Sequence, residues 1–142
     1  MINLIGMPSE ELINWCLSKG EKGFRAKQLL SWMHKKNIKD FNSMSNLSKN
    51  FRDLLSQEAC IFVPKIENSY RSLDGSKKWL LTLGSGDVIE MVLIPDKDRN
   101  TLCISSQAGC AVDCSFCSTG SQGFSRNLTS DEIISQLWIA KK

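Results

Sequence analysis

The chain has 142 residues, of which 42% are hydrophobic and 23% are charged, so it is long enough to bury one core and is globular in composition. Its net charge is only +3, so a nucleic-acid interface must depend on where the charges lie. The amino terminus lacks the charged region and apolar run of a signal peptide, and no stretch approaches the roughly 20 apolar residues of a membrane span. We therefore expect a cytoplasmic protein that does not contact a membrane.

Three amphipathic helices are predicted in the first part of the chain. The first begins after Pro8, where two early acids favour a helix start, and ends near Gly20. The second covers residues 24–36, and the third begins after Ser45 or Ser48. The positions expected to form their apolar faces are Leu12, Ile13, Cys16, Leu17, Ala26, Leu29, Leu30, Met33, Leu47, Phe51, Leu54 and Leu55. Residues 1–60 are therefore predicted to form a small helical domain.

Basic side chains concentrate between residues 19 and 39, where seven lysines and arginines accompany a single acid, Glu21. This charge favours contact with RNA, although such a run more commonly forms a solvated helix surface. Trp15 and Trp32 can stack on bases, but their helical spacing beside leucines also fits a core. His34 lies next to two lysines and is expected at the surface rather than as a ligand or general base.

From Ile61 the pattern changes to extended runs separated by turns, which is typical of an antiparallel meander. The expected strands cover 61–72, 79–83 and 88–94, and the turns at 74–75 and 84–87 contain glycine. We assign residues 61–98 to this β extension. A polar turn then precedes a last strand over 101–105, which leads into a cysteine-rich stretch.

Cys110, Cys114 and Cys117 place three of the six cysteines within eight residues, in the spacing C-x3-C-x2-C. In a reducing cytoplasm such a cluster is better accounted for by metal binding or chemistry than by disulfides. Thiolates are soft ligands that suit iron-sulfur or zinc. Three thiolates on a four-iron cluster leave one iron open for a substrate, which is what a radical S-adenosylmethionine enzyme requires.

After the cysteines, Thr129 and Glu132 form a capping box that opens a helix, with Ile133, Ile134, Leu137 and Trp138 on its expected apolar face. A strand, a cofactor loop and a helix make one β/α unit, whereas a complete barrel needs about 200 to 250 residues. The expected fold class is α+β leading into α/β, with residues 99–142 as the start of a truncated radical SAM partial barrel. We therefore expect the chain to be a fragment.

The cysteines are also compatible with two arrangements that lack an iron-sulfur cluster. Cys103 can act as a fourth ligand in a tetrahedral zinc site with the spacing C-x6-C-x3-C-x2-C. Burial of the three thiols without metal is the remaining possibility, and it fits poorly with thiols so closely spaced in a glycine-flanked loop.

The sequence resembles the RlmN family of radical methyltransferases. The likeness is carried by Cys-Ala-Val-Asp-Cys-Ser-Phe-Cys-Ser-Thr-Gly from Cys110, by Gln-Gly-Phe-Ser-Arg-Asn-Leu from Gln122, and by Phe-Arg-Ala-Lys-Gln-Leu-Leu-Ser-Trp from Phe24. It includes Glu-Met-Val-Leu-Ile-Pro from Glu90 and extends over nearly the whole chain. The motifs after the cysteines distinguish this family from other radical enzymes.

The resemblance implies an enzyme that methylates C2 of adenosine in 23S rRNA and tRNA with a 4Fe-4S cluster and S-adenosylmethionine. Adenine C2 is electron-poor, so an ordinary polar methyl transfer fails there. In the family a methyl group on a carrier cysteine is converted to a carbon radical that adds to C2, which joins the protein covalently to RNA. We expect the carrier cysteine to lie beyond Lys142 and the chain to be inactive alone.

Three residues outside the cluster acquire roles from the resemblance. Glu90 matches the base that removes the C2 proton, Cys103 matches the cysteine that resolves the adduct by forming a disulfide, and Phe116 matches an aromatic beside the adenine of the cofactor. Without the family, Glu90 is either a water-facing edge residue or a buried acid suited to proton transfer. Cys103 alone is interpreted as a small buried hydrophobe.

The expected partners are 23S rRNA, tRNA and a flavodoxin-like electron donor, and the expected state is a monomer. The alternative function is a zinc-stabilised RNA-binding module without catalysis, which differs from the enzyme in its metal and in the use of Cys103 as a ligand.

Overall fold

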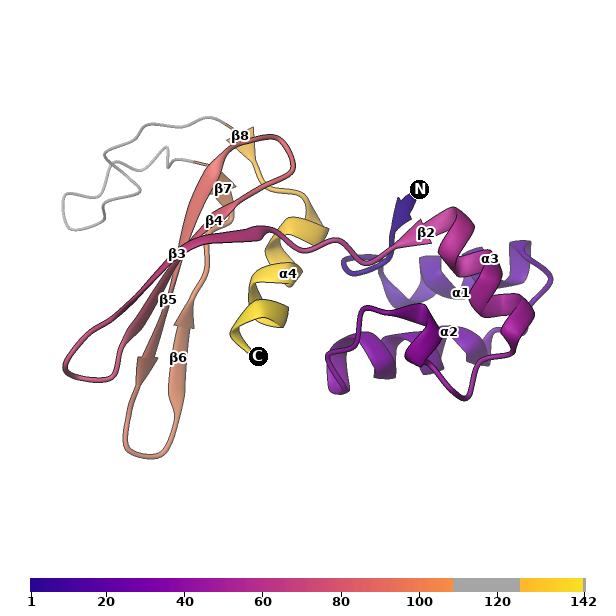
Figure 1. Cartoon of the computed structure of the whole chain (residues 1–142), viewed down its shortest axis with the longest axis horizontal. Coiled ribbons are helices and arrows are strands. Elements are labelled where there is room, and N and C mark those ends of the chain that lie inside the picture. Colours follow the sequence, from indigo (N-terminus) through magenta and orange to yellow (C-terminus); the bar gives the residue numbers. More distant parts are fainter. Residues whose placement is uncertain (109–125, 142) are drawn as a thin grey trace. The chain divides into compact units, whose positions relative to one another are not determined.

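The structure, a computed structural model, describes residues 1–108 and 126–141. The described residues form two units, one of Met1–Phe62 with Lys141 and one of Val63–Ala140 (Figure 1). No helix in these described residues is long and apolar enough to cross a membrane.

The first unit is helical, with a two-stranded pairing of its ends. Its elements are β1 (Ile2–Asn3), α1 (Ser9–Ser18), α2 (Phe24–Leu30), a π-helical turn (Ser31–Lys35), a 3-10 turn (Phe41–Ser43), α3 (Lys49–Glu58) and β2 (Ala59–Cys60). Strands β1 and β2 pair in parallel, with Ile2 opposite Ala59. The sequence predicts neither of these short strands, because a two-residue strand has no periodicity to detect.

Helix α1 ends as the sequence predicts. Gly20 takes a φ of +79°, and the Gly20 and Glu21 amides donate to the carbonyls of Leu17 and Cys16 at 3.1 and 3.0 Å. These two bonds form a Schellman motif, which needs a left-handed residue at this position. Leu12 and Cys16 are buried as expected, but Leu17 is 53% exposed, so its assignment to the apolar face was wrong.

The second and third helices follow the predicted pattern with small changes. The helix expected over 24–36 is α until Leu30 and then widens to a π turn, where the Lys36 amide donates to the Ser31 carbonyl at 3.1 Å. Helix α3 begins at Ser48 rather than Ser45, because the Ser48 hydroxyl accepts from the Phe51 amide at 3.2 Å. The largest fully buried side chains of this unit are Phe51, Leu4, Ile5, Leu12, Leu29, Met33, Met44 and Leu55.

The second unit contains the predicted antiparallel meander. Strands β3 (Lys65–Arg71), β4 (Lys77–Thr82), β5 (Val88–Pro95) and β6 (Asn100–Cys103) lie in that order in one sheet (Figure 1). The two glycine turns form where expected, with a φ of +89° at Gly75 and +94° at Gly86. The strand expected over 101–105 ends at Cys103 and is the fourth strand of this sheet. The division of the chain at residues 98 and 99 stays a prediction.

The strand register separates two faces of this sheet. Trp79 pairs with Met91 and Leu81 with Ile89, and these four side chains are at most 5% exposed. Because side chains alternate along a strand, the residues between them point to the opposite face. The fully buried side chains of the sheet therefore lie on one face, and the other face carries Lys78 and Glu90 together with Leu80 and Val92.

Two short strands and one helix complete the second unit. Strand β7 (Gln107–Ala108) pairs antiparallel with β8 (Arg126–Asn127), and α4 covers Ser130–Ala140. The buried residues of α4 are Ser135, Gln136, Trp138 and Ile139, whereas Ile134 and Leu137 are 36% and 47% exposed. The predicted apolar face of this helix was therefore wrong for those two residues, because a buried glutamine, invisible to a hydrophobic pattern, faces inward instead.

Candidate functional site

Glu90 and Cys103 lie on the same face of the sheet, on neighbouring strands. Cys103 of β6 pairs with Val92 of β5, and Glu90 is two residues from Val92 along the same strand. Residues two apart on a strand share a face, so Glu90 and Cys103 are diagonal neighbours, for which Cα atoms are typically about 7 to 8 Å apart. The face is opposite to the one that carries Trp79, Leu81, Ile89 and Met91.

Glu90 occupies an interior strand and is partly buried. Its side chain is 17% exposed, and Oε1 lies 3.2 Å from Nζ of Lys78 on β4. The register places Lys78 opposite Val92, so this ion pair crosses the strands diagonally on the same face. Glu90 is therefore not a water-facing edge residue, and Lys78 orients its carboxylate.

Cys103 ends its strand with an accessible side chain. It is a free, exposed cysteine, so the interpretation of Cys103 as a small buried hydrophobe was wrong. By contrast, Cys16 of α1 is fully buried, and burial, with a smaller contribution from Glu21, raises the pKa of its thiol to about 11. The sheet thus carries a thiol and a carboxylate on one face of neighbouring strands, the two groups that thiol chemistry coupled to proton removal requires.

The three clustered cysteines and Phe116 lie outside the described residues. The segment that contains them leaves the described structure after Ala108 and returns at Arg126, and these two residues pair across β7 and β8. Among residues 1–108 and 126–141, no group of three or more histidine, cysteine or acidic side chains is placed to hold a metal. The donor set of the segment, three thiolates, fits an iron-sulfur cluster with one open iron.

Arg126 fixes the end of this segment with a set of hydrogen bonds that the sequence did not reveal. Its Nε donates to Asp87 at 2.9 Å, and its two Nη groups donate to the two carboxylate oxygens of Glu132 at 2.9 and 2.8 Å. Nη2 also donates to the Ser85 hydroxyl at 2.7 Å, and Nη1 to the Asn127 carbonyl at 3.2 Å. All five N–H donors of the guanidinium are therefore used.

Glu132 also forms one of the two bonds of the predicted capping box, whereas the Thr129 hydroxyl donates to Asp131 at 2.5 Å. The Glu132 carboxylate accepts from the Thr129 amide at 2.8 Å, which confirms the helix start read from the sequence. Hydrogen bonding from Arg126 holds the pKa of Glu132 below its ordinary value against the opposing effect of burial. The hydrogen bonds of Arg126 thus connect β8 to the β4–β5 turn and to the start of α4.

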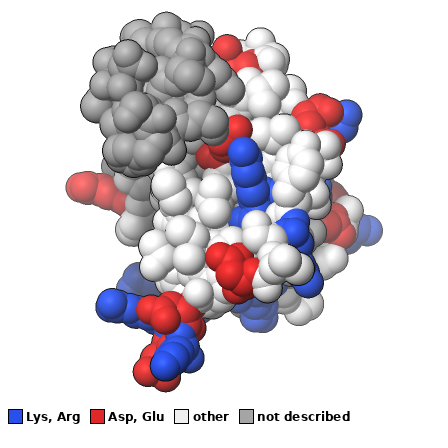
Figure 2. Space-filling model, turned by 90° about the vertical axis from the view of Figure 1, so that its left-hand side faces the viewer, with Lys and Arg blue, Asp and Glu red and all other residues white. Residues whose placement is uncertain are grey.

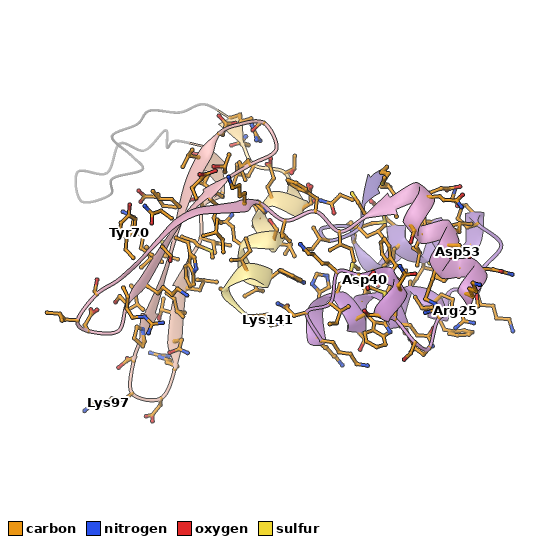
Figure 3. The ribbon with its side chains drawn as sticks, in the orientation of Figure 1. Arg25, Asp40, Asp53, Tyr70, Lys97 and Lys141 are labelled. Atoms are coloured by element: carbon orange, nitrogen blue, oxygen red, sulfur yellow. The ribbon has the colours of Figure 1, made fainter. Side chains whose placement is uncertain are left out.

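The basic residues of the first unit are only partly available to a ligand. Lys19 forms an ion pair with Glu58, and Arg25 lies 3.6 Å from Glu21. Lys27, Lys35 and Lys39 are exposed. Arg25, labelled in Figure 3, also donates to the Gln28 side chain at 2.9 Å and to the Asn46 carbonyl at 3.2 Å.

Each tryptophan of the first unit has a lysine ammonium near its ring. The ammonium of Lys36 lies 3.6 Å from the centroid of the Trp32 ring, whose Nε1 donates to Asn46 at 2.6 Å. Lys19 lies 5.7 Å from the Trp15 ring. His34 is half-buried, and burial lowers its pKa, so its prediction as a surface residue was only partly right.

Charges of both signs are intermingled on the face of the molecule shown in Figure 2, as far as its described residues go. Lys97, at the tip of the β5–β6 hairpin, sits between Asp96 and Asp98, and it projects outward in Figure 3 together with Tyr70 of β3. Charge on this face therefore does not single out a binding surface.

A solved structure with a similar fold indicates the class of protein. The chain is similar to the crystal structure of a radical SAM methyltransferase from Sphaerobacter thermophilus, with a TM-score of 0.86 and 33% identity, over 99% of this chain and 41% of that one. The arrangement of the described elements is thus the one found in part of a radical SAM methyltransferase.

The sequence comparisons give the family. Residues 2–61 match the ribosomal RNA large subunit methyltransferase N-terminal domain. The chain is also 48% identical over 141 residues to the dual-specificity RNA methyltransferase RlmN of Marinobacter nauticus, a match that covers 99% of this chain and 38% of that protein. Together these matches support an amino-terminal fragment of an RlmN protein.

Proposed function

We propose that this chain is part of a radical S-adenosylmethionine enzyme that methylates C2 of adenosine in 23S rRNA and tRNA. The observation that carries the proposal is the pairing of β5 with β6, which sets Glu90 and Cys103 on one sheet face immediately before the cysteine segment. The similarity to RlmN of Marinobacter nauticus supports the substrate class.

In this proposal Cys110, Cys114 and Cys117 would hold a 4Fe-4S cluster, and Phe116 would contact S-adenosylmethionine. When bound, the cluster and S-adenosylmethionine would supply radical chemistry that activates a methyl group carried on a cysteine. The first β/α unit of a partial barrel begins around the cysteine segment. Because the chain spans 38% of the length of its Marinobacter relative, we infer that it does not complete catalysis alone.

Glu90 and Cys103 act when the methyl carbon has bonded to adenine C2 and still bonds the carrier sulfur. Glu90 takes the C2 proton on a carboxylate oxygen, and Lys78 orients that carboxylate from 3.2 Å. The thiolate of Cys103 then attacks the carrier sulfur and a disulfide forms. As the bond from the carrier sulfur to carbon breaks, its electron pair stays with the methylene carbon, which takes a proton and becomes the methyl group on C2. The accessible thiol of Cys103 and its position beside Glu90 suit these two steps.

The helical first unit is proposed to contact the RNA through exposed lysines near α2, namely Lys27, Lys35 and Lys39. Phosphate contacts by lysine give affinity without sequence specificity. We further propose a monomer reduced by a flavodoxin-like electron donor in the cytoplasm.

Anaerobic reconstitution of the chain with iron and sulfide tests the cluster. We expect about four irons per chain and a broad sulfur-to-iron charge-transfer band in the visible absorption spectrum. Replacing Cys110, Cys114 or Cys117 with serine should abolish both. Cys103→Ser is the matched control and should retain the iron. Stoichiometric zinc that is lost in Cys103→Ser would overturn the proposal in favour of a zinc-stabilised RNA-binding module.

A further inference from the structure

Gln136 of α4 is a fully buried polar side chain whose hydrogen bonds converge on one distant residue. It is 0% exposed, and with Ser135 it makes up the buried polar residues of the described structure. Its Nε2 donates to the Ser105 carbonyl at 2.7 Å, and its Oε1 accepts from the Ser105 amide at 2.8 Å. The second hydrogen of Nε2 points to the Glu132 carbonyl at 3.3 Å.

These two hydrogen bonds resemble those that a neighbouring β-strand would make to Ser105. An amide side chain that both donates to and accepts from one backbone residue satisfies both polar groups of that residue, as a neighbouring strand does. The ladder between β5 and β6 ends with Val92 opposite Cys103, so Ser105 has passed the last pair of the sheet. Gln136 therefore holds the chain in place where the sheet no longer does.

Ser105 is also hydrogen-bonded to Glu90. Its hydroxyl donates to the main-chain carbonyl of Glu90 at 2.6 Å. This hydrogen bond thus joins the backbone of Glu90 to Ser105, which lies two residues after Cys103. Both proposed reactive side chains are attached to the same hydrogen-bonded element.

We propose that Ser105 and Gln136 are positioning residues that hold the thiol of Cys103 against the carboxylate of Glu90. The meaning of that geometry for catalysis rests on the proposed function, in which both groups act on one adduct. Without the Gln136 side chain, the partly buried amide and carbonyl of Ser105 would lose these partners, and without the Ser105 hydroxyl the segment after β6 would lose its bond to Glu90 on β5.

The distance between the two side chains can be measured directly by cross-linking. Glu90→Cys provides a second thiol beside Cys103, and the other five cysteines are removed by Cys16→Ala and by serine at Cys60, Cys110, Cys114 and Cys117. Dibromobimane becomes strongly fluorescent only when it bridges two thiols a few ångströms apart. In this background we expect rapid bridging, and a rate about five- to tenfold lower after Ser105→Ala or Gln136→Met, the effect of losing one or two buried hydrogen bonds.

Matched controls separate positioning from general destabilisation. Ser106→Ala removes the exposed neighbouring hydroxyl and should leave the bridging rate unchanged. Ser105→Thr keeps the hydroxyl and should restore bridging, and circular dichroism checks that each variant is folded. If Gln136→Met does not fold, Ser105→Ala decides alone.

Bridging in Ser105→Ala at the rate of Ser106→Ala would overturn the proposal. So would an equal loss in Ser105→Thr and Ser105→Ala. Because the measurement needs neither iron nor RNA, its outcome is independent of the reconstitution that tests the proposed function.

Discussion

Arg126 of the second unit links three elements through its side chain. Its guanidinium binds both oxygens of Glu132 while its Nε binds Asp87, and so it connects residues 39 and 6 positions away in the sequence. The planar fork of arginine suits this bidentate geometry, which a lysine ammonium cannot reproduce. The capping box at Thr129 predicted one partner of Glu132, but a hydrophobic pattern or turn motif carries no signal for the contact with Asp87.

The depressed pKa of Glu132 leads to a prediction about acid stability. A carboxyl whose pKa is lower in the folded state stabilises the fold above its unfolded value, near 4.5, and this contribution disappears as the pH falls through the folded value. We expect Glu132→Gln to lower the urea midpoint at pH 7, and the difference from the unsubstituted chain to shrink below pH 4.5. A difference that stays constant from pH 7 to pH 3 would show that the ionised carboxylate does not stabilise the fold.

The two cysteines Cys16 and Cys103 should differ strongly in reactivity. Burial and Glu21 raise the pKa of Cys16 from 9.0 to about 11, which lowers its thiolate fraction at neutral pH about a hundredfold. Cys103 is exposed. We expect iodoacetamide at pH 7.5 to modify Cys103 at least about a hundredfold faster than Cys16, as measured by peptide mass spectrometry. In urea the two rates should converge, and similar rates in the native chain would contradict the burial of Cys16.

At the scale of elements, the sequence predicts what depends on neighbouring residues and misses what depends on distant ones. Helices α1 and α3 and the glycine turns at Gly75 and Gly86 follow from caps, periodicity and positive φ. The buried face of α4 does not, because Gln136 faces inward to bond Ser105, which lies 31 positions away. The register that brings Glu90 beside Cys103 is likewise a long-range property, and from the sequence only the family resemblance connected the two residues.

The lysines around α2 give a prediction about RNA binding. Lys27 and Lys35 are exposed, whereas Lys19 is already paired with Glu58. If exposed lysines contact phosphates, replacing both Lys27 and Lys35 with glutamine should weaken binding to a 23S rRNA hairpin. The slope of log K against log salt should become shallower by about 1.4, because each phosphate contact to single-stranded RNA contributes about 0.7. Lys19→Gln is the matched control and should change neither quantity. Unchanged affinity in the double variant would identify those lysines as a solvated surface.

At the scale of the whole molecule, the described chain consists of two units, each with its own buried residues. The division after Phe62 lies close to the border at residue 60 that the change from helical to alternating pattern predicted. Composition and periodicity change abruptly at residue 60, which is the basis of that prediction. They could not reveal that β1 and β2 pair in parallel, which brings both ends of the first unit together.

This closure predicts that residues 1–62 fold by themselves and that β2 is required. Ala59 and Ile61 are 2% and 8% exposed, and burying one isoleucine stabilises a fold by roughly 1.5 to 3 kcal/mol. In a unit of this size such a loss is a large part of the total stability. We expect residues 1–62 to show a cooperative thermal transition by circular dichroism, and residues 1–58 to melt at a much lower temperature or without cooperativity. Equal transitions for the two lengths would show that the parallel pair does not stabilise this unit, whereas a gradual loss of signal in residues 1–62 would show that the helical core needs further chain to fold.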